Sequence, residues 1–212
     1  MMESYQTLKA GTSAIGEFTD RKSRFIAEIR PCTSETEAHE FLSEVKSHYF
    51  DARHQVPAWI FADGRKRCSD DGEPSRTAGM PTLEVLEGAG LKDVCCVTTR
   101  YFGGTLLGPG GLVRAYTAAA QAAVEAARTA GSIIEMTLVT PVVAEIPYSA
   151  YERVRRMAED AGGKVTDSIF SADVQLTLAF RSGEEEPFLA ALKELAAGEE
   201  RAHALKTRFA EF

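Results

Sequence analysis

The sequence has 212 residues, of which 44% are hydrophobic and 26% charged, with a net charge of −7. This composition is typical of a soluble globular protein and excludes a disordered or collagenous chain. No apolar run approaches the roughly 20 residues that cross a bilayer, so we expect no membrane-spanning segment. The N-terminus lacks the basic and apolar regions of a signal peptide, which predicts a cytoplasmic protein whose four cysteines are reduced.

The length and the charge distribution predict two domains, residues 1–131 and residues 132–212. Either part is long enough to bury a core of its own. The formal charge is −2 over the first part and −5 over the second, so the acidity lies mainly in the second. The longest helical pattern ends at Gly131, a suitable C′ residue, and a new strand pattern follows it.

The first domain alternates strands and helices after an initial hairpin, which predicts a mixed α/β layer. Ser34 and Glu37 form a capping-box pattern that predicts the start of a helix. The expected elements are strands at 12–18 and 24–30 joined by a turn at 19–22, a helix at 35–49, a strand at 55–62, a helix at 81–87, a strand at 94–99 and an alanine-rich helix at 112–127.

The second domain has the order β-α-β-β-α-β, which predicts a ferredoxin-like fold. Ser149 with Glu152 and Ser182 with Glu185 predict the two helix starts. Pro141 lies inside the first strand and predicts an edge position or a bulge there, because proline cannot donate to a sheet. The expected strands are 136–146, 164–170, 173–180 and 203–209.

The segment from Arg100 to Arg114 is rich in glycine and leads from a buried strand into the alanine-rich helix. A helix N-terminus presents unpaired N–H groups, so this loop could cradle a phosphate, with the two arginines adding charge. It lacks the signature of a P-loop or of a dinucleotide fingerprint. The glycines could equally serve a tight crossover and close helix packing. The candidate binding glycines are Gly103, Gly104, Gly108, Gly110 and Gly111.

The acidic segment from Ser69 to Gly79 carries three carboxylates, those of Asp70, Asp71 and Glu73. Oxygen-rich groups suit Mg²⁺ or Ca²⁺, and paired carboxylates can transfer protons. The spacing departs from an EF-hand, and arginines lie close by in sequence, so a surface loop held by Asx-turns and ion pairs is favoured. We therefore predict no metal and no cofactor.

His54 precedes a strand and follows Arg53, where an imidazole could accept a proton or contact a phosphate. An isolated histidine more often has a structural role. No serine or cysteine has an identifiable base beside it in sequence, so the sequence gives no support for nucleophilic catalysis.

Four segments together resemble the YigZ/IMPACT family: Lys22–Phe25, Ala52–His54, Ser69–Gly79 and above all Val97–Tyr116. The resemblance implies an α+β protein of two domains. The first would be similar to the second domain of a small-subunit ribosomal protein and to domain IV of elongation factor G. The second would be a ferredoxin-like domain similar to that factor's domain V.

The resemblance also implies a link to translation, because eukaryotic members of the family regulate translation initiation under starvation. The sequence departs from the family pattern at His54-Gln55-Val56, where an H-x-C pattern is expected, and at Arg76, where the loop often has glycine. These departures give no support for thiol chemistry at that strand.

We therefore predict a translation-associated regulatory protein, without catalysis, that binds RNA or a ribosome-linked partner. Arg100, Arg114 and the glycine loop would make the contact, with Arg53, His54 and Arg76 nearby. The net charge of −7 requires that these basic groups be segregated on one face. An alternative is a phosphate-ligand-binding protein or small-molecule enzyme that uses the glycine loop and the acidic segment. A third is a protein-interaction module that uses the ferredoxin-like sheet.

Overall fold

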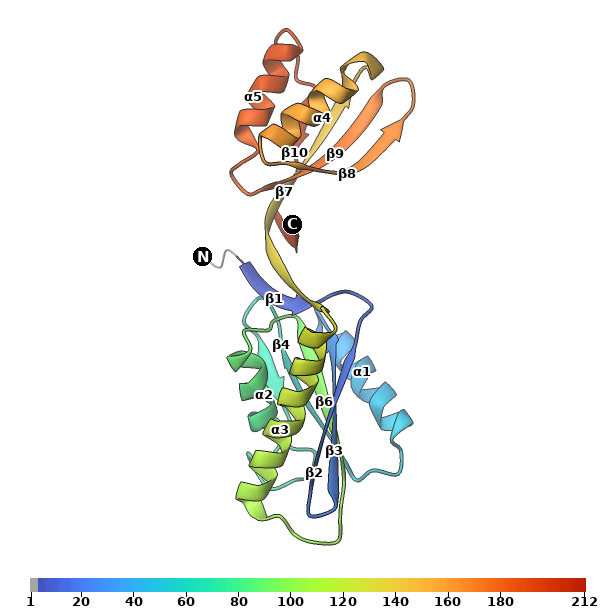
Figure 1. The fold of residues 1–212 in the computed structure, drawn as a ribbon, viewed down its shortest axis with the longest axis vertical. Coiled ribbons are helices and arrows are strands. Elements are labelled where there is room, and N and C mark those ends of the chain that lie inside the picture. The colour runs from blue at the N-terminus through green and yellow to red at the C-terminus, as the bar shows by residue number, and fades with distance from the viewer. Residues whose placement is uncertain (1–3) are drawn as a thin grey trace. The chain divides into compact units, whose positions relative to one another are not determined.

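A computed structural model describes residues 4–212 as two compact units, residues 5–134 and residues 135–212, each of mixed α+β structure (Figure 1). The expectation of an α+β protein with two domains is confirmed. The elements of the N-terminal unit are β1 (Ser4–Leu8), β2 (Ala14–Asp20), β3 (Ser23–Pro31), α1 (Glu35–His48), β4 (His54–Ile60), β5 (Lys66–Cys68), α2 (Gly79–Gly88), β6 (Val94–Tyr101) and α3 (Gly108–Thr129).

The main sheet of the N-terminal unit is antiparallel, with the strand order β2-β3-β6-β4-β5. Helices α2 and α3 cover one face of this sheet and α1 covers the other (Figure 1). Strand β6 is therefore buried on both faces, which explains its continuous apolar sequence from Val94 to Val97.

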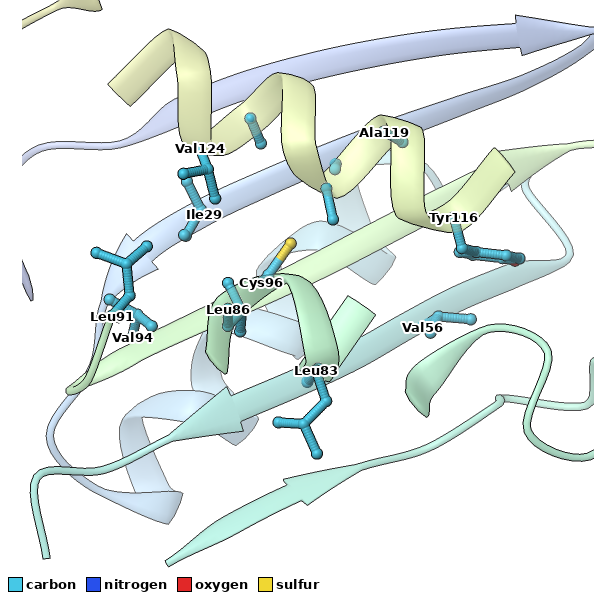
Figure 2. Close-up of a cluster of buried hydrophobic side chains, with 14 of the residues drawn as sticks. Ile29, Val56, Leu83, Leu86, Leu91, Val94, Cys96, Tyr116, Ala119 and Val124 are labelled. Atoms are coloured by element: carbon cyan, nitrogen blue, oxygen red, sulfur yellow. The ribbon is translucent and has the colours of Figure 1, made fainter. Parts of the chain in front are cut away.

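The larger core lies between this sheet and the α2/α3 layer. Figure 2 shows Tyr116, Ala119 and Val124 of α3 directed toward side chains from β3 and β6, including Ile29 and Cys96. Alanines along α3 allow its backbone to approach the sheet closely, because a methyl group needs little space.

The hairpin and the first helix form as their local sequence signals predict. Arg21 and Lys22 occupy a two-residue turn with φ values of 44° and 65°, the left-handed conformation that suits the twist of a hairpin. At α1, the Ser34 hydroxyl accepts a hydrogen bond from the backbone N–H of Glu37 at 3.2 Å. The Glu37 carboxylate in turn accepts one from the N–H of Thr33 at 2.8 Å, so both side chains satisfy amides at the helix start.

The C-terminal unit places α4 and α5 on one face of a sheet in which β7 lies between β9 and the two short strands β10 and β11. Strand β8 pairs with the far side of β9, and all these pairings are antiparallel. The elements are β7 (Ile133–Ile146), a 3₁₀ turn (Tyr148–Ala150), α4 (Tyr151–Asp160), β8 (Lys164–Phe170), β9 (Val174–Arg181), α5 (Glu186–Leu195), β10 (Ala202–Ala204) and β11 (Arg208–Glu211).

The two helix caps predicted for this unit are wrong. Ser149 lies inside the 3₁₀ turn that leads directly into α4, whose N-cap is Ala150 and carries no side-chain cap. The N–H of Ser182 instead donates to the carbonyl oxygen of Leu138, which extends the β9 pairing, and α5 begins after Glu185. A capping box needs an extended residue at the N-cap, and neither serine occupies that position.

Pro141 lies in a strand that is flanked on both sides and is not at the edge of the sheet, but the expected irregularity is found opposite it, where three residues (205–207) face two (140 and 141) between the pairs Ala204–Val142 and Arg208–Val139. The final strand expected at 203–209 is instead broken into β10 and β11. Opposite Pro141 the chain runs through this break, and the N–H of Leu205 donates to the Pro141 carbonyl at 2.7 Å. The N and carbonyl oxygen of one strand residue point to the same side, so the missing donor of Pro141 faces the break.

The four cysteines are free thiols, three of them buried. Burial raises the pKa of the Cys96 thiol to about 12, which keeps it protonated and unreactive. Between residues 4 and 212, no helix has both the length and the apolar character needed to cross a bilayer.

Gly16→Ala should strongly destabilise the N-terminal unit. A Cβ on Gly16 would lie 2.0 Å from the backbone nitrogen of Ala123, so β2 and α3 must separate. We expect a loss of about 3 kcal/mol in the free energy of unfolding. Urea unfolding monitored by the fluorescence of Trp59, the single tryptophan, measures this loss.

Gly88→Ala is the matched control. No atom lies within 4 Å of its added Cβ, so this helix residue should gain about 0.5–1 kcal/mol. Equal changes in the free energy of unfolding for the two variants would contradict the explanation that Gly16 permits close packing of β2 against α3.

Candidate functional site

Three side chains form a row across the sheet where β6 ends and β4 begins. Arg100 of β6 is paired in register with Phe25 of β3 on one side and with His54 of β4 on the other. Residues that are directly opposite in antiparallel strands point to the same face. Phe25 packs edge-to-face on Tyr116 of α3, with ring centroids 5.0 Å apart, so the row faces α3.

Arg100 is buried and forms an ion pair with Glu73 of the acidic segment. Its Nη1 lies 2.6 Å and 2.9 Å from the two carboxylate oxygens of Glu73, and the hydroxyl of Tyr116 donates to the nearer of them at 2.9 Å. Burial, followed by the charge of Glu73, raises the pKa of Tyr116 far above its ordinary range, so this hydroxyl remains a donor. The sequence predicts that Arg100 contacts a phosphate or RNA, whereas the structure shows its charge largely neutralised by Glu73.

Two carboxylates of the acidic segment, those of Asp70 and Asp71, accept hydrogen bonds from backbone N–H groups of the protein. Asp70 accepts hydrogen bonds from the backbone N–H groups of Arg76, Ala78 and Gly79 at 2.7, 3.0 and 2.9 Å, which closes the segment and fixes the start of α2. Asp71 accepts from the N–H of Gln55 at 2.7 Å. Within residues 4–212 no group of carboxylates, histidines and cysteines is arranged to hold a metal ion.

His54 is held by the same segment. Its Nδ1 lies 2.7 Å from the carbonyl oxygen of Asp71, and because a carbonyl oxygen can only accept, Nδ1 carries the hydrogen. In the neutral ring, Nε2 therefore presents a lone pair.

The predicted glycines divide into two groups. A Cβ on Gly103 would lie 2.2 Å from the backbone of Lys22 and Ser23, and the Gly103 N–H already donates to the Ser23 hydroxyl at 3.0 Å. Gly111 is buried, and a Cβ there would lie 2.9 Å from the side chain of Leu107. These two glycines serve close packing. Gly104 and Gly108 have φ values of 84° and 70°, which permit the turns of the loop, and Gly110 is exposed, with only the Arg114 guanidinium recorded within 4 Å of an added Cβ.

The first turn of α3 has no side-chain cap, and it contains no acidic residue. Gly108 and Gly110 are exposed there, at the positive end of the helix dipole. The Arg114 guanidinium folds back over this turn, with Nη1 3.9 Å from the position that a Cβ on Gly110 would take. In the part of the chain that the structure describes, Arg114 has no carboxylate partner.

A pocket of about 240 Å³ opens beside this turn. Its walls are Arg53, His54, Arg100, Phe102 and Leu106. The structure thus brings together three of the predicted binding residues, Arg53 just before β4, His54 of β4 and Arg100 of β6, with two apolar side chains of the glycine loop. Phe102 is 56% exposed and Leu106 80% exposed, which is unusual for large apolar residues.

Arg76 is outside this group. It does not line the pocket, and its backbone N–H, rather than its guanidinium, makes the recorded hydrogen bond. Its φ of 63° is one that glycine adopts more readily, which accounts for glycine as the common residue at this point of the loop.

Four residues at this end of the unit are not among those predicted from the sequence. Arg21 and Lys22 are exposed at the β2–β3 turn, which lies against Gly103 of the loop (Figure 1). Phe102 and Leu106 flank two of the candidate glycines and are not themselves predicted binding residues. The available signal was two large apolar residues in a loop too rich in glycine to belong to a core.

The fold and this site define a two-unit protein with a basic, glycine-rich end on its first unit. The Impact N-terminal domain matches residues 21–124, which include every residue of the site, and a domain of unknown function (DUF1949) matches residues 145–199. IMPACT family member YigZ of Escherichia coli is 32% identical over 201 residues, covering 93% of this chain and 96% of YigZ. The chain belongs to the IMPACT family.

Other similarities cover different shares of the chain. IMPACT family member YvyE of Bacillus subtilis is 46% identical over 118 residues, 55% of this chain and 54% of YvyE. Human Protein IMPACT is 33% identical over 98 residues, which span 43% of this chain and 30% of that protein. A solved structure titled "Crystal structure of an hypothetical protein" has 29% identity and a TM-score of 0.64, covering 97% of this chain and 98% of its own.

Glu73→Gln should cost about 3–5 kcal/mol of unfolding free energy, because it leaves the buried Arg100 guanidinium without a charge partner. The side chains of the pair are 4% and 8% exposed, so water cannot take over that role. Urea unfolding followed by Trp59 fluorescence measures the loss. The double variant Glu73→Leu with Arg100→Met removes both charges and should recover much of the stability. A double variant less stable than Glu73→Gln would refute this explanation.

Asp70→Asn should change how stability depends on pH. Burial alone would raise the pKa of Asp70, but the three backbone N–H donors outweigh it and lower the pKa below 3.8. The stabilisation is therefore complete above the ordinary aspartate pKa and disappears as the pH falls through the folded-state value. We expect the variant to be about 2 kcal/mol less stable at neutral pH and to lose less on acidification. Urea unfolding midpoints measured over an acidic pH series test both effects. If the stability of the two proteins fell in parallel with pH, the hydrogen bonds from the three backbone N–H groups to Asp70 could not be the source of the pH dependence.

Proposed function

We propose that this IMPACT family member is a translation-associated regulatory protein that binds RNA through the basic end of its N-terminal unit. The observation that carries the proposal is the uncapped first turn of α3, with the Arg114 guanidinium beside it and no carboxylate in that turn. Exposed N–H groups at a helix start together with an unpaired arginine suit phosphate oxygens. A ribosome-associated protein is the other partner that the family resemblance suggests.

The distribution of charge supports an anionic partner despite the net charge of −7. Arg21, Lys22, Arg53 and Arg114 are exposed around the loop, and none has a carboxylate partner within residues 4–212. Several exposed basic residues elsewhere in the unit are paired, as Arg24 is with Glu17 at 2.7 Å, although Lys9 and Arg67 are exposed without a recorded carboxylate partner in the described residues. Binding to phosphates depends on such local unpaired cations, because each contact releases condensed counterions from the nucleic acid.

The family resemblance supports a role in translation, and the strand topology supports the proposed fold of the C-terminal unit. The resemblance to eukaryotic IMPACT proteins, which regulate translation, supports a role in translation for the shared N-terminal domain. We further propose that the N-terminal unit has the fold of a ribosomal-protein second domain, with a boundary near Gly131. We also propose that the C-terminal unit is ferredoxin-like. The order β10/β11-β7-β9-β8 supports the latter assignment, because it places the first and third strands of a β-α-β-β-α-β unit side by side.

No specific observation favours the enzymatic alternative. A metal or a proton transfer would need Asp70, Asp71 or Glu73, and each of these carboxylates accepts hydrogen bonds from the protein itself. This alternative also requires a phosphate contact at the glycine loop, and the Arg114→Ala experiment described next tests that contact.

Arg114→Ala should weaken the binding of a structured RNA hairpin at low salt, by roughly the contribution of one phosphate contact. The slope of log affinity against log salt should also fall by about 1. Fluorescence anisotropy of a labelled hairpin over a salt series measures both quantities.

The matched control is Arg128→Ala, at the opposite end of the same helix, where the side chain lies 3.7 Å from Glu125. Its affinity and salt slope should equal those of the unchanged protein. Absence of binding by the unchanged protein, or equal losses in the two variants, would disprove RNA binding through this end.

A further inference from the structure

We infer that the pocket formed by Arg53, His54, Arg100, Phe102 and Leu106 receives one unstacked base of single-stranded RNA. This inference rests on the proposed function, because the same end of the unit supplies the phosphate contacts. It adds a substrate class, single strands with accessible bases, and a chemical role for side chains that phosphate binding does not use.

The size of the pocket fits a single ring system. Its volume of about 240 Å³ lies below the 300–1,000 Å³ typical of sites for drug-sized ligands. A folded duplex or a whole dinucleotide could not enter it. One base turned out from a strand is of suitable size, and single-stranded RNA exposes its bases in this way.

The apolar walls offer a stacking surface. Phe102 and Leu106 are both exposed and both line the pocket, so burying them against a flat partner would remove apolar surface from water. Stacking of bases on aromatic side chains is the general means by which proteins bind single strands. The Arg100 guanidinium lies 5.7 Å from the centre of the Phe102 ring, which adds a second planar group at the same place.

The polar walls offer both a donor and an acceptor. Glu73 engages only Nη1 of Arg100, so the guanidinium, which lines the pocket, keeps N–H groups on Nη2 that can donate to a ligand. Its Nε is enclosed without a hydrogen-bond partner within residues 4–212 and is out of reach of a ligand in the pocket. His54 presents Nε2 as an acceptor, because Nδ1 donates to Asp71. The edge of a base carries acceptors and donors side by side and matches this pair.

The charge around the pocket favours a nucleotide over an aromatic side chain of a protein. Arg53 lines the pocket, is exposed and has no carboxylate partner in the described residues, and the open first turn of α3 follows Leu106 closely in sequence. A base is always attached to phosphates, which these groups can bind, whereas a phenyl or indole ring brings no such charge.

The test compares two labelled oligomers of equal length and charge by fluorescence anisotropy at low salt. One is a single-stranded oligouridylate, and the other is the same ribose-phosphate chain without bases. The unchanged protein should bind the base-bearing oligomer about tenfold more tightly, the gain expected from stacking one base. Phe102→Ala should bring this ratio close to one and leave the affinity for the abasic chain unchanged.

Phe170→Ala is the matched control, because Phe170 is also 56% exposed but lies in the C-terminal unit. It should keep the tenfold ratio. Since Phe102 is exposed, its replacement should leave the thermal unfolding midpoint unchanged, and Leu106→Ala gives a second variant with the same expected outcome.

The possible failures are distinct. Equal affinity for the two oligomers, or a ratio that survives Phe102→Ala, overturns the base pocket and leaves RNA binding in place. Binding of a hairpin but of neither single strand also overturns it. Failure to bind any of the three RNAs overturns the proposed function together with the pocket and points to a protein partner.

Discussion

The guanidinium of Arg100 is the point where the sheet, the acidic segment and α3 meet, because a buried positive charge needs a carboxylate within reach. Glu73 provides that carboxylate and also accepts the hydroxyl of Tyr116. Glu73 can reach this position only because Asp70 and Asp71 fold their segment against α2 and β4. These carboxylates, for which the sequence favours a loop held by Asx-turns and ion pairs over a catalytic or metal-binding set, are used to bury one arginine, and the exposed surface nearby keeps its unpaired basic groups.

The glycine-rich loop combines the two functions that the sequence left open. Gly103 and Gly111 are places where a side chain would strike the protein itself, so they fix the path of the chain from β6 into α3. Gly108 and Gly110 lie at an exposed helix start where no side chain of residues 4–212 caps the turn. The close contact of Gly103 with the β2–β3 turn fixes the path of the loop. The path of the loop in turn fixes the positions of Phe102 and of the exposed start of α3.

Features encoded by adjacent residues could be predicted from the sequence, and features made by distant ones could not. The β2–β3 hairpin and the Ser34 cap depend on neighbours within a few positions, and both are found. Local pattern failed at Ser182, because pairing of its N–H with Leu138 of a strand far away in sequence overrode the capping signal. The ion pair joins positions 73 and 100, and nothing in either local sequence shows that this arginine is buried. The basic and glycine-rich character of the site was visible, but its apolar wall was not.

The overall negative charge and the proposed anionic partner are compatible because electrostatic attraction in salt is local. At physiological ionic strength the screening length is about 8 Å, so carboxylates on distant surfaces add little to the field at the loop. Many of those carboxylates are also neutralised by neighbours, as Asp63 is by Arg65 at 2.7 Å. At the loop the balance is different: Arg53 and Arg114 have no such neighbour within residues 4–212. The sign of the charge that an approaching molecule meets is therefore set by the pairing pattern of a few arginines, and the net charge of the chain is a poor guide to its partner.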